Sequence, residues 1–239
     1  WSGSLGSTGF NAVGELLSGK VNPSGRLSDT YAYDLTTAPA YWNAGDFTYA
    51  NLKHHYVEYA EGIYVGYRFY ETRYVDNTTG ICDEAAYAKA VHYPFGYGLS
   101  YTSFTYSDAA IAQKADSYEI SVKVTNSGNA EGKEVVELYY SDPQNKTLNK
   151  PVLELKAYAK TRSLKPGESE TVKLTVKAAD LASFDISSSS WVVSAAEGKF
   201  LIGSSSEDIR ATLTAKVKAS SQKVSDVLRP KQSLNLLHR

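Results

Sequence analysis

The sequence predicts a mixed α/β fragment followed by an all-β sandwich, and three observations lead to this prediction. An amphipathic helical repeat near the N-terminus is followed by strong turn signals. The chain is then rich in aromatic residues, with no clean period, up to about residue 100. Beyond residue 100, short segments alternate apolar and polar side chains between turn residues, which is the pattern of an antiparallel sandwich.

The composition excludes several classes of function. Lys and Arg number 25 against 26 Asp and Glu, so charge gives no support to a nucleic-acid or membrane partner. No apolar run reaches the roughly 18–20 residues of a membrane-spanning helix. The glycine-rich GSLGS and GSTG stretches lack the pattern of a nucleotide-binding loop. The single Cys82 cannot form an internal disulfide and lies in no zinc-binding spacing, so we expect neither a metal nor a cofactor.

The first element expected is a short helix in GFNAVGELLSGK. Four apolar residues recur there at three- and four-residue spacing and form one helical face: Phe10, Val13, Leu16 and Leu17. Gly19 and the following NPSGR sequence end the helix. Residues 29–60 show no clean period and are expected to be extended loop over a surface.

The stretch EGIYVGYRFYET, residues 61–72, is enriched in aromatic and β-branched residues and is predicted to be a strand. Side chains alternate along a strand, so Tyr64 and Tyr70 share one face, and Tyr67 and Phe69 share the other. We expect these rings to be interface packing, with direct stacking on a sugar as the alternative.

Glu61 has two interpretations. It is either a general acid beside an aromatic pocket or the partner of Arg68 or Arg73 in a buried ion pair. We expect the ion pair, so Glu61 and Arg68 are assigned structural roles.

The remaining elements follow in order. Residues 75–90 are expected to form a turn and then a short helix or loop, and the YPFGYG stretch a tight turn into a strand. Further strands are expected at residues 117–128, 132–143, 151–164 and 170–178, with three more between 184 and 217. About seven strands without a paired Cys favour a fibronectin III-like (immunoglobulin-like) sandwich that lacks the immunoglobulin disulfide.

Several of these blocks resemble motifs of family 3 glycoside hydrolases. GELLSGKVNPSGRLSDT at 14–30 resembles a helix and turn near the end of their second domain. EGIYVGYRFYE at 61–71 and YPFGYGLSYTSFTYS at 93–107 are similar to two later blocks of that family. The strands between 122 and 209 resemble its C-terminal fibronectin III-like domain, and the matches run in order across about residues 1–217.

The resemblance implies a division of the chain into four parts. They are the end of an α/β sandwich domain (1–60), an aromatic connecting segment (61–100), a fibronectin III-like domain (101–217) and a tail or linker (218–239). The chain contains no Met and begins with Trp, so we expect it to be a piece of a longer polypeptide.

The resemblance also implies a β-glucosidase-like enzyme that acts on a β-linked glucoside or oligosaccharide, or on a related glycoside, with retention of configuration. In that family the nucleophilic Asp lies on a (β/α)8 barrel and the acid/base Glu lies upstream of the segment matching Trp1. Neither stretch occurs here, so we expect no catalytic residue in this segment. The barrel is expected in the same protein or in a second chain, and both the usual and a circularly permuted domain order stay open.

The irregular aromatic loop YWNAGDFTY, residues 41–49, is the candidate for substrate contact. It carries Trp42, Asp46 and Tyr49, and loops on rigid scaffolds often carry binding groups. The alternative is that this loop packs on the barrel or on another subunit of a homo-oligomer. The alternative for the whole chain is a non-catalytic, carbohydrate- or protein-binding fibronectin III-like module. Cytoplasmic and secreted locations both fit the sequence.

Overall fold

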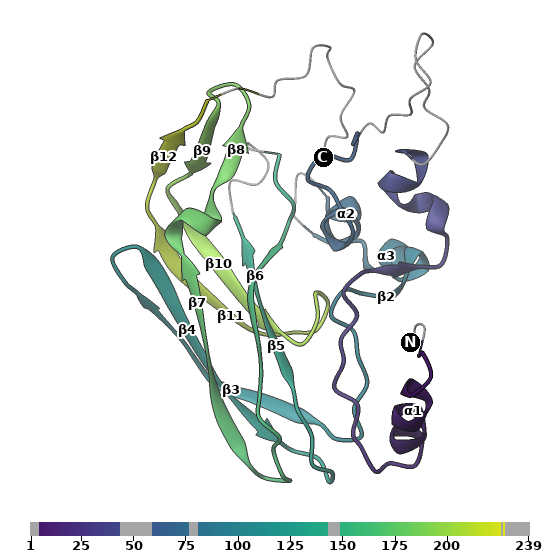
Figure 1. The fold of residues 1–239 in the computed structure, drawn as a ribbon. Coiled ribbons are helices and arrows are strands. Elements are labelled where there is room, and N and C mark those ends of the chain that lie inside the picture. The colour runs from purple at the N-terminus through teal and green to yellow at the C-terminus, as the bar shows by residue number, and fades with distance from the viewer. Residues whose placement is uncertain (1–4, 44–58, 77–80, 143–148, 226, 228–239) are drawn as a thin grey trace.

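The computed structural model describes residues 5–43, 59–76, 81–142, 149–225 and 227. Residues before about 103 form a small lobe of helices and turns, which we call the N-terminal lobe, and the rest form a β-sandwich with a small additional sheet (Figure 1). None of the helices in these ranges is long and apolar enough to cross a membrane.

The sandwich consists of a four-stranded and a three-stranded antiparallel sheet. The four-stranded sheet has the order β11-β10-β5-β6, from Ile209–Val217, Ala196–Gly203, Val135–Ser141 and Glu154–Lys160. The three-stranded sheet has the order β3-β4-β7, from Phe104–Gln113, Ser117–Asn126 and Ser169–Lys177. This arrangement confirms the predicted fold class, and each strand predicted from the alternating pattern is present.

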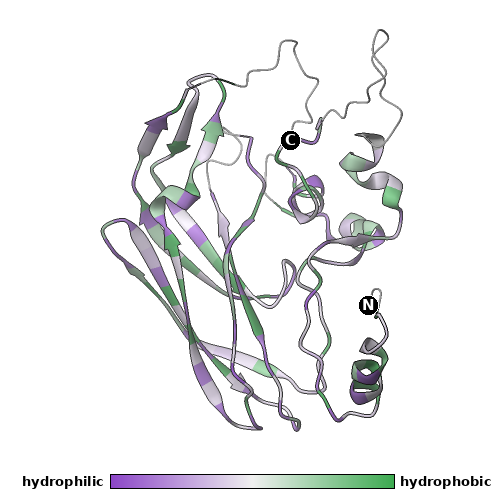
Figure 2. Cartoon of the chain, viewed as in Figure 1, coloured by the Kyte–Doolittle hydropathy of each residue, from purple (hydrophilic) through white to green (hydrophobic). Residues whose placement is uncertain are grey.

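The core lies between the two sheets because the inward positions of the strands are apolar. Burial alternates strictly along β4, and Ile120 and Val122 face the core beside their β7 partners Leu174 and Val172. Figure 2 shows apolar and polar residues alternating along these strands. The facing sheet contributes five deeply buried residues: Val136, Leu138, Tyr140, Phe200 and Ile202.

A third sheet closes one end of the sandwich. It has the order β12-β9-β8, from Ser220–Lys223, Ser190–Val193 and Ser183–Asp185, and the 3-10 helix η3, Ala178–Leu181, leads into it. Residues 220–223 belong to the segment that was expected to be tail or linker, and they form a strand. These residues pair with β9 along its free edge, a backbone interaction that needs no apolar pattern and therefore left no signal in the sequence.

The N-terminal lobe contains three short helices and a two-stranded ribbon. The helices are α1 (Gly9–Leu17), α2 (Tyr67–Arg73) and α3 (Glu84–Ala90). Strands β1 (Tyr31–Ala32) and β2 (Val91–Tyr93) pair with each other, and the 3-10 helices η1 (Leu35–Thr37) and η2 (Pro39–Asn43) follow β1. The helix predicted in GFNAVGELL is confirmed as α1, and α3 confirms the short helix expected before residue 90.

The predicted strand over residues 61–72 is wrong, because this stretch is a turn followed by α2. Gly62 and Gly66 have φ of +54° and +56°, a left-handed conformation that interrupts an extended chain and that glycine adopts without steric cost. Tyr64 and Tyr70 are both buried, each 3% exposed. Tyr64 lies on the turn and Tyr70 on the helix, so they do not share one face of a strand.

Candidate functional site

The structure places buried carboxylates and aromatic rings where the N-terminal lobe packs on the outer face of the four-stranded sheet. Strand β5 has five consecutive buried residues, because the lobe covers the side chains that point away from the core. Tyr139 is one of them, and the Tyr67 ring of α2 meets it edge-on at a centroid distance of 6.1 Å. The same Tyr67 ring packs on Phe95 at 4.6 Å, and its hydroxyl accepts the Leu155 N–H at 2.7 Å.

Glu137, the second outward residue of β5, lies beneath the tight turn that contains Gly96. It is 4% exposed and accepts a 2.5 Å hydrogen bond from the Tyr139 hydroxyl. Burial raises the pKa of Glu137 to about 7, although the Tyr139 hydrogen bond and the charge of Arg26 act in the opposite direction. Gly96 has φ of +82°, and a Cβ there would lie 2.7 Å from Ser205 Cα and against the Glu137 carboxylate. The turn therefore fits on Glu137 only because residue 96 has no side chain.

A second carboxylate, Glu71 at the end of α2, is buried between the lobe and the β10–β11 turn. It is 5% exposed, and its Oε1 accepts hydrogen bonds from Tyr87 of α3 at 2.8 Å and from Ser206 at 2.7 Å. Burial raises the pKa of Glu71 to about 8, and the neighbouring Glu207 carboxylate raises it further.

A third carboxylate, Glu134, joins the NPSGR segment to the sandwich. Arg26 donates to Glu134 Oε2 at 2.5 Å and to the Gly98 carbonyl at 2.9 Å. Tyr106 donates its hydroxyl to Glu134 Oε1 at 3.0 Å. Burial raises the pKa of Glu134 in spite of the Arg26 charge. The structure thus brings together the segments at 14–30 and 93–107, which are far apart in the sequence.

Of the residues assigned to structural roles, Tyr64 and Tyr67 form hydrogen bonds across this interface, whereas Tyr70 packs within the lobe. The Tyr64 hydroxyl donates to Asn149, with 2.9 Å to both the carbonyl oxygen and Oδ1. The Tyr70 hydroxyl is 2.9 Å from Thr37 Oγ1. Glu61 is buried at 5% exposed, but none of the ion pairs between described residues joins it to Arg68 or Arg73.

The positive charge of Arg68 acts on Glu154, a carboxylate of β6. Burial raises the pKa of Glu154, but the positive charges of Lys156, Arg68 and Lys150 outweigh that effect, and the net pKa is lowered. The structure therefore gives Arg68 an electrostatic role beside β6.

Of the candidates for substrate contact, Asp46, Tyr49 and the side chain of Trp42 lie outside the described residues. Sequence reasoning missed Glu71, Glu134 and Glu137. The only signal was their place among aromatic and β-branched neighbours, in RFYET and GKEVVELYY. In the described part of the chain, no group of three or more His, Cys, Asp or Glu side chains is placed to hold a metal ion.

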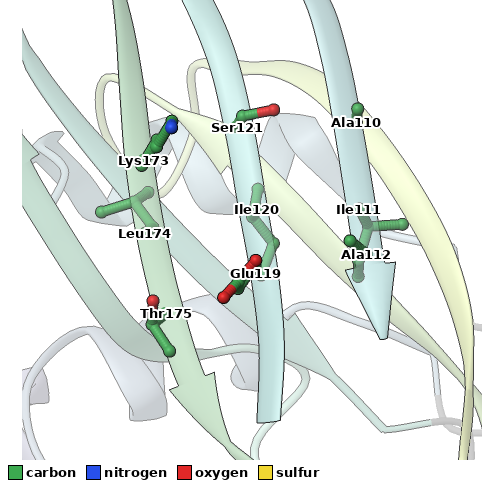
Figure 3. A pocket seen from close by; sticks show the side chains of 9 residues that line it. All are labelled: Ala110, Ile111, Ala112, Glu119, Ile120, Ser121, Lys173, Leu174 and Thr175. Carbon is green, nitrogen blue, oxygen red and sulfur yellow. The ribbon is translucent and has the colours of Figure 1, made fainter. Parts of the chain in front are cut away.

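A hollow of about 320 Å³ lies across the three-stranded sheet, away from the lobe (Figure 3). The register places Ala112, Glu119 and Thr175 in one row across it and Ala110, Ser121 and Lys173 in the next. Its lining contains no aromatic ring, so it has no surface on which a sugar could stack.

Glu71 and Glu134 hold two parts of the chain together, whereas Glu137 is hydrogen-bonded within its own strand. Glu71 and Glu137 accept from hydroxyls, and Glu134 accepts from a hydroxyl and a guanidinium. A retaining glycosidase instead needs two carboxylates about 5–5.5 Å apart on either side of a bound sugar. None of these three described carboxylates lines the hollow on the three-stranded sheet.

Comparison with known proteins identifies the family. A fibronectin type III-like domain model matches residues 134–206. The structure of β-glucosidase 3B from Thermotoga neapolitana in complex with glucose is 37% identical, with a TM-score of 0.75 over 89% of this chain and 27% of that chain. β-Glucosidase A from Butyrivibrio fibrisolvens is 41% identical over 88% of this chain and 25% of its own length. β-Glucosidase BoGH3A from Bacteroides ovatus is 39% identical over 88% of this chain and 26% of its own length.

The chain belongs to family 3 of the glycoside hydrolases. This confirms the resemblance found in the sequence motifs, and the matching region is the C-terminal portion of these enzymes. The chain spans about a quarter of the length of the family 3 relatives it matches.

Proposed function

We propose that this chain is part of a retaining β-glycosidase that hydrolyses terminal β-D-glucosyl residues, and that it supports and completes an active site formed mainly by a (β/α)8 barrel. The observation that carries the proposal is that its similarity to β-glucosidases extends over 88% of the chain, and so includes the N-terminal lobe as well as the sandwich. A shared fibronectin III-like domain alone would have matched only the second half.

The exposed apolar surface of the N-terminal lobe supports the proposal that the lobe is part of a domain, and that further protein completes this domain. Helix α1 has no buried residue, and Phe10 and Leu17 on its apolar face are 69% and 80% exposed. An amphipathic helix gains most of its stability by burying its apolar face. In the complete enzyme, residues 1–60 are the end of an α/β sandwich domain, and its remainder covers this face.

The catalytic carboxylates lie outside this segment in the proposed enzyme. The nucleophilic Asp belongs to the barrel, and the acid/base Glu belongs to the part that precedes residue 1. Trp42, Asp46 and Tyr49 contact a distal part of the substrate, a β-linked glucoside or oligosaccharide. The buried carboxylates support this division, since each already has a partner within the fold.

The test is an assay of the 239-residue chain on an aryl β-glucoside, alone and mixed with a family 3 fragment that contains the barrel and the rest of the α/β sandwich domain. We expect no hydrolysis by the chain alone and hydrolysis by the mixture. The barrel-containing fragment alone is the control. Hydrolysis by the chain alone would contradict the absence of catalytic residues, and binding to a glucoside without complementation would favour a non-catalytic binding module.

A further inference from the structure

The contact between Glu71 and the β10–β11 turn joins the two parts of the molecule through a group that can change charge. Ser206 lies on this turn, and its backbone N–H donates to the Phe95 carbonyl of the lobe at 3.0 Å. Its hydroxyl donates to Glu71 Oε1 at 2.7 Å, and Tyr87 donates to the same oxygen from the opposite side of the contact. A single buried carboxyl group therefore links α2, α3 and the sandwich.

Glu207, the residue after Ser206, brings a second carboxylate to this contact. Glu207 is exposed, and its carboxylate lies beside Glu71 with no described cation paired to either of them. Two negative charges at such a site repel each other strongly when one of them is desolvated. A proton shared between the two carboxyl groups removes the repulsion and adds a strong hydrogen bond.

We propose that Glu71 and Glu207 form an acid-closed clasp, which holds the N-terminal lobe on the sandwich while one proton is shared between them and opens as that proton is lost. Both hydroxyl donors reach Oε1 of Glu71, so its other oxygen carries the shared proton. Loss of the proton leaves a buried carboxylate beside a second carboxylate, and separation of the lobe from the turn lets water solvate Glu71.

The sign of the pH dependence follows from the proton balance. The closed clasp holds a proton that the open state releases, so closure is favoured at low pH and lost as the pH rises toward the raised pKa of Glu71, about 8. Other titrating groups face the same contact. They are Cys82 and Tyr87 from the α3 side and Glu137 and Tyr139 from β5.

Hydrogen exchange of the 239-residue chain tests the clasp directly. The Ser206 amide is protected by a lobe carbonyl, so we expect its protection, corrected for the intrinsic pH dependence of exchange, to fall more than about tenfold between pH 6 and pH 9. The β4–β7 amides in the sandwich core serve as an internal reference and should keep their protection over this range.

Glu71→Gln is the decisive variant, because its amide keeps the acceptor for Tyr87 and Ser206 and supplies a permanent donor to Glu207. In this variant we expect the fall in Ser206 protection between pH 6 and pH 9 to be at most half that of the wild type. The remaining fall is due to Glu137. Glu207→Gln, at an exposed position, tests the same contact if Glu71→Gln does not fold, and it should also reduce the response. Glu197→Gln, at an exposed site on β10, is the matched control and should respond like the wild type. The clasp would be overturned if Ser206 protection in the wild type is independent of pH. It would also be overturned if the fall in protection in Glu71→Gln is more than half that of the wild type. If Glu71→Gln does not fold, an unreduced fall in Glu207→Gln would overturn it.

Discussion

Lys150 shows how a single charged residue can determine local stability in this molecule. Its ammonium group is 3.0 Å from Asp142 and 3.3 Å from the Leu181 carbonyl, with the Tyr140 ring at 5.8 Å. The side chains of Lys150 and Asp142 are 2% and 6% exposed. A charge at this depth is tolerated only when it is paired and hydrogen-bonded.

Lys150→Ala is therefore expected to lower the free energy of unfolding by about 3–5 kcal/mol, because it removes the buried cation that compensates the charge of Asp142. Urea unfolding followed by circular dichroism measures the change. Lys114→Ala is the control, since Lys114 and Glu119 form a pair with 52% and 55% exposed side chains, and it should cost less than about 1 kcal/mol. Equal costs for the two variants would contradict the structural role of Lys150.

The turn between β2 and β3 is the element that sets how closely the lobe approaches the sandwich. Residues 94–97 form this turn, with the Tyr97 N–H bonded to the Pro94 carbonyl and the Gly96 N–H bonded to the Leu27 carbonyl. Gly96 requires both a left-handed backbone and an empty Cβ position. Two separate physical effects therefore act at one residue.

A pair of glycine variants separates these two effects. Gly167, in the KPGES turn, has φ of +81° and no atom within 4 Å of a built Cβ, so Gly167→Ala should cost only the backbone strain of about 1–2 kcal/mol. Gly96→Ala should cost about 1–3 kcal/mol more, because its Cβ meets Ser205 and the Glu137 carboxylate. Thermal unfolding of both variants measures the difference, and equal losses would mean that the lobe moves away from β5 without cost.

At the scale of the whole molecule, the exposed apolar residues gather on the N-terminal lobe. Phe10, Leu17, Leu35 and Leu99 are each about 70–80% exposed, and fewer of the described large apolar residues outside the lobe, such as Tyr158 and Ile186, are as exposed. The proposed function explains this asymmetry, because the lobe is the part that the rest of the enzyme covers. The acid-closed clasp lies on the other side of the same lobe, where it meets the sandwich.

Phe10→Ser tests the asymmetry in both settings. In the chain alone it should change the free energy of unfolding by less than about 0.5 kcal/mol, because an exposed ring contributes little. In the mixture with the barrel-containing fragment it should weaken association and lower the recovered glucosidase activity several-fold. Phe104→Ser, in the sandwich core at 7% exposed, is the contrasting variant and should destabilise the chain itself. Unimpaired complementation by Phe10→Ser would mean that α1 is not covered in the enzyme.

The sequence by itself determined the sandwich, α1 and the family, because these depend on local periodicity and on ordered motifs. Alternation in SYEISVKVTN specifies an inward and an outward face wherever the strand lies, and β4 has the expected faces. Only the tertiary structure decided the fate of EGIYVGYRFYET, where left-handed Gly62 and Gly66 turn an aromatic run into a turn and a helix. Likewise, Glu71 and Glu134 have partners far away in the chain: Ser206 is 135 residues from Glu71, and Arg26 is 108 residues from Glu134. Burial and hydrogen bonding between distant segments determine the charge of these carboxyl groups, and local sequence does not encode which segments meet.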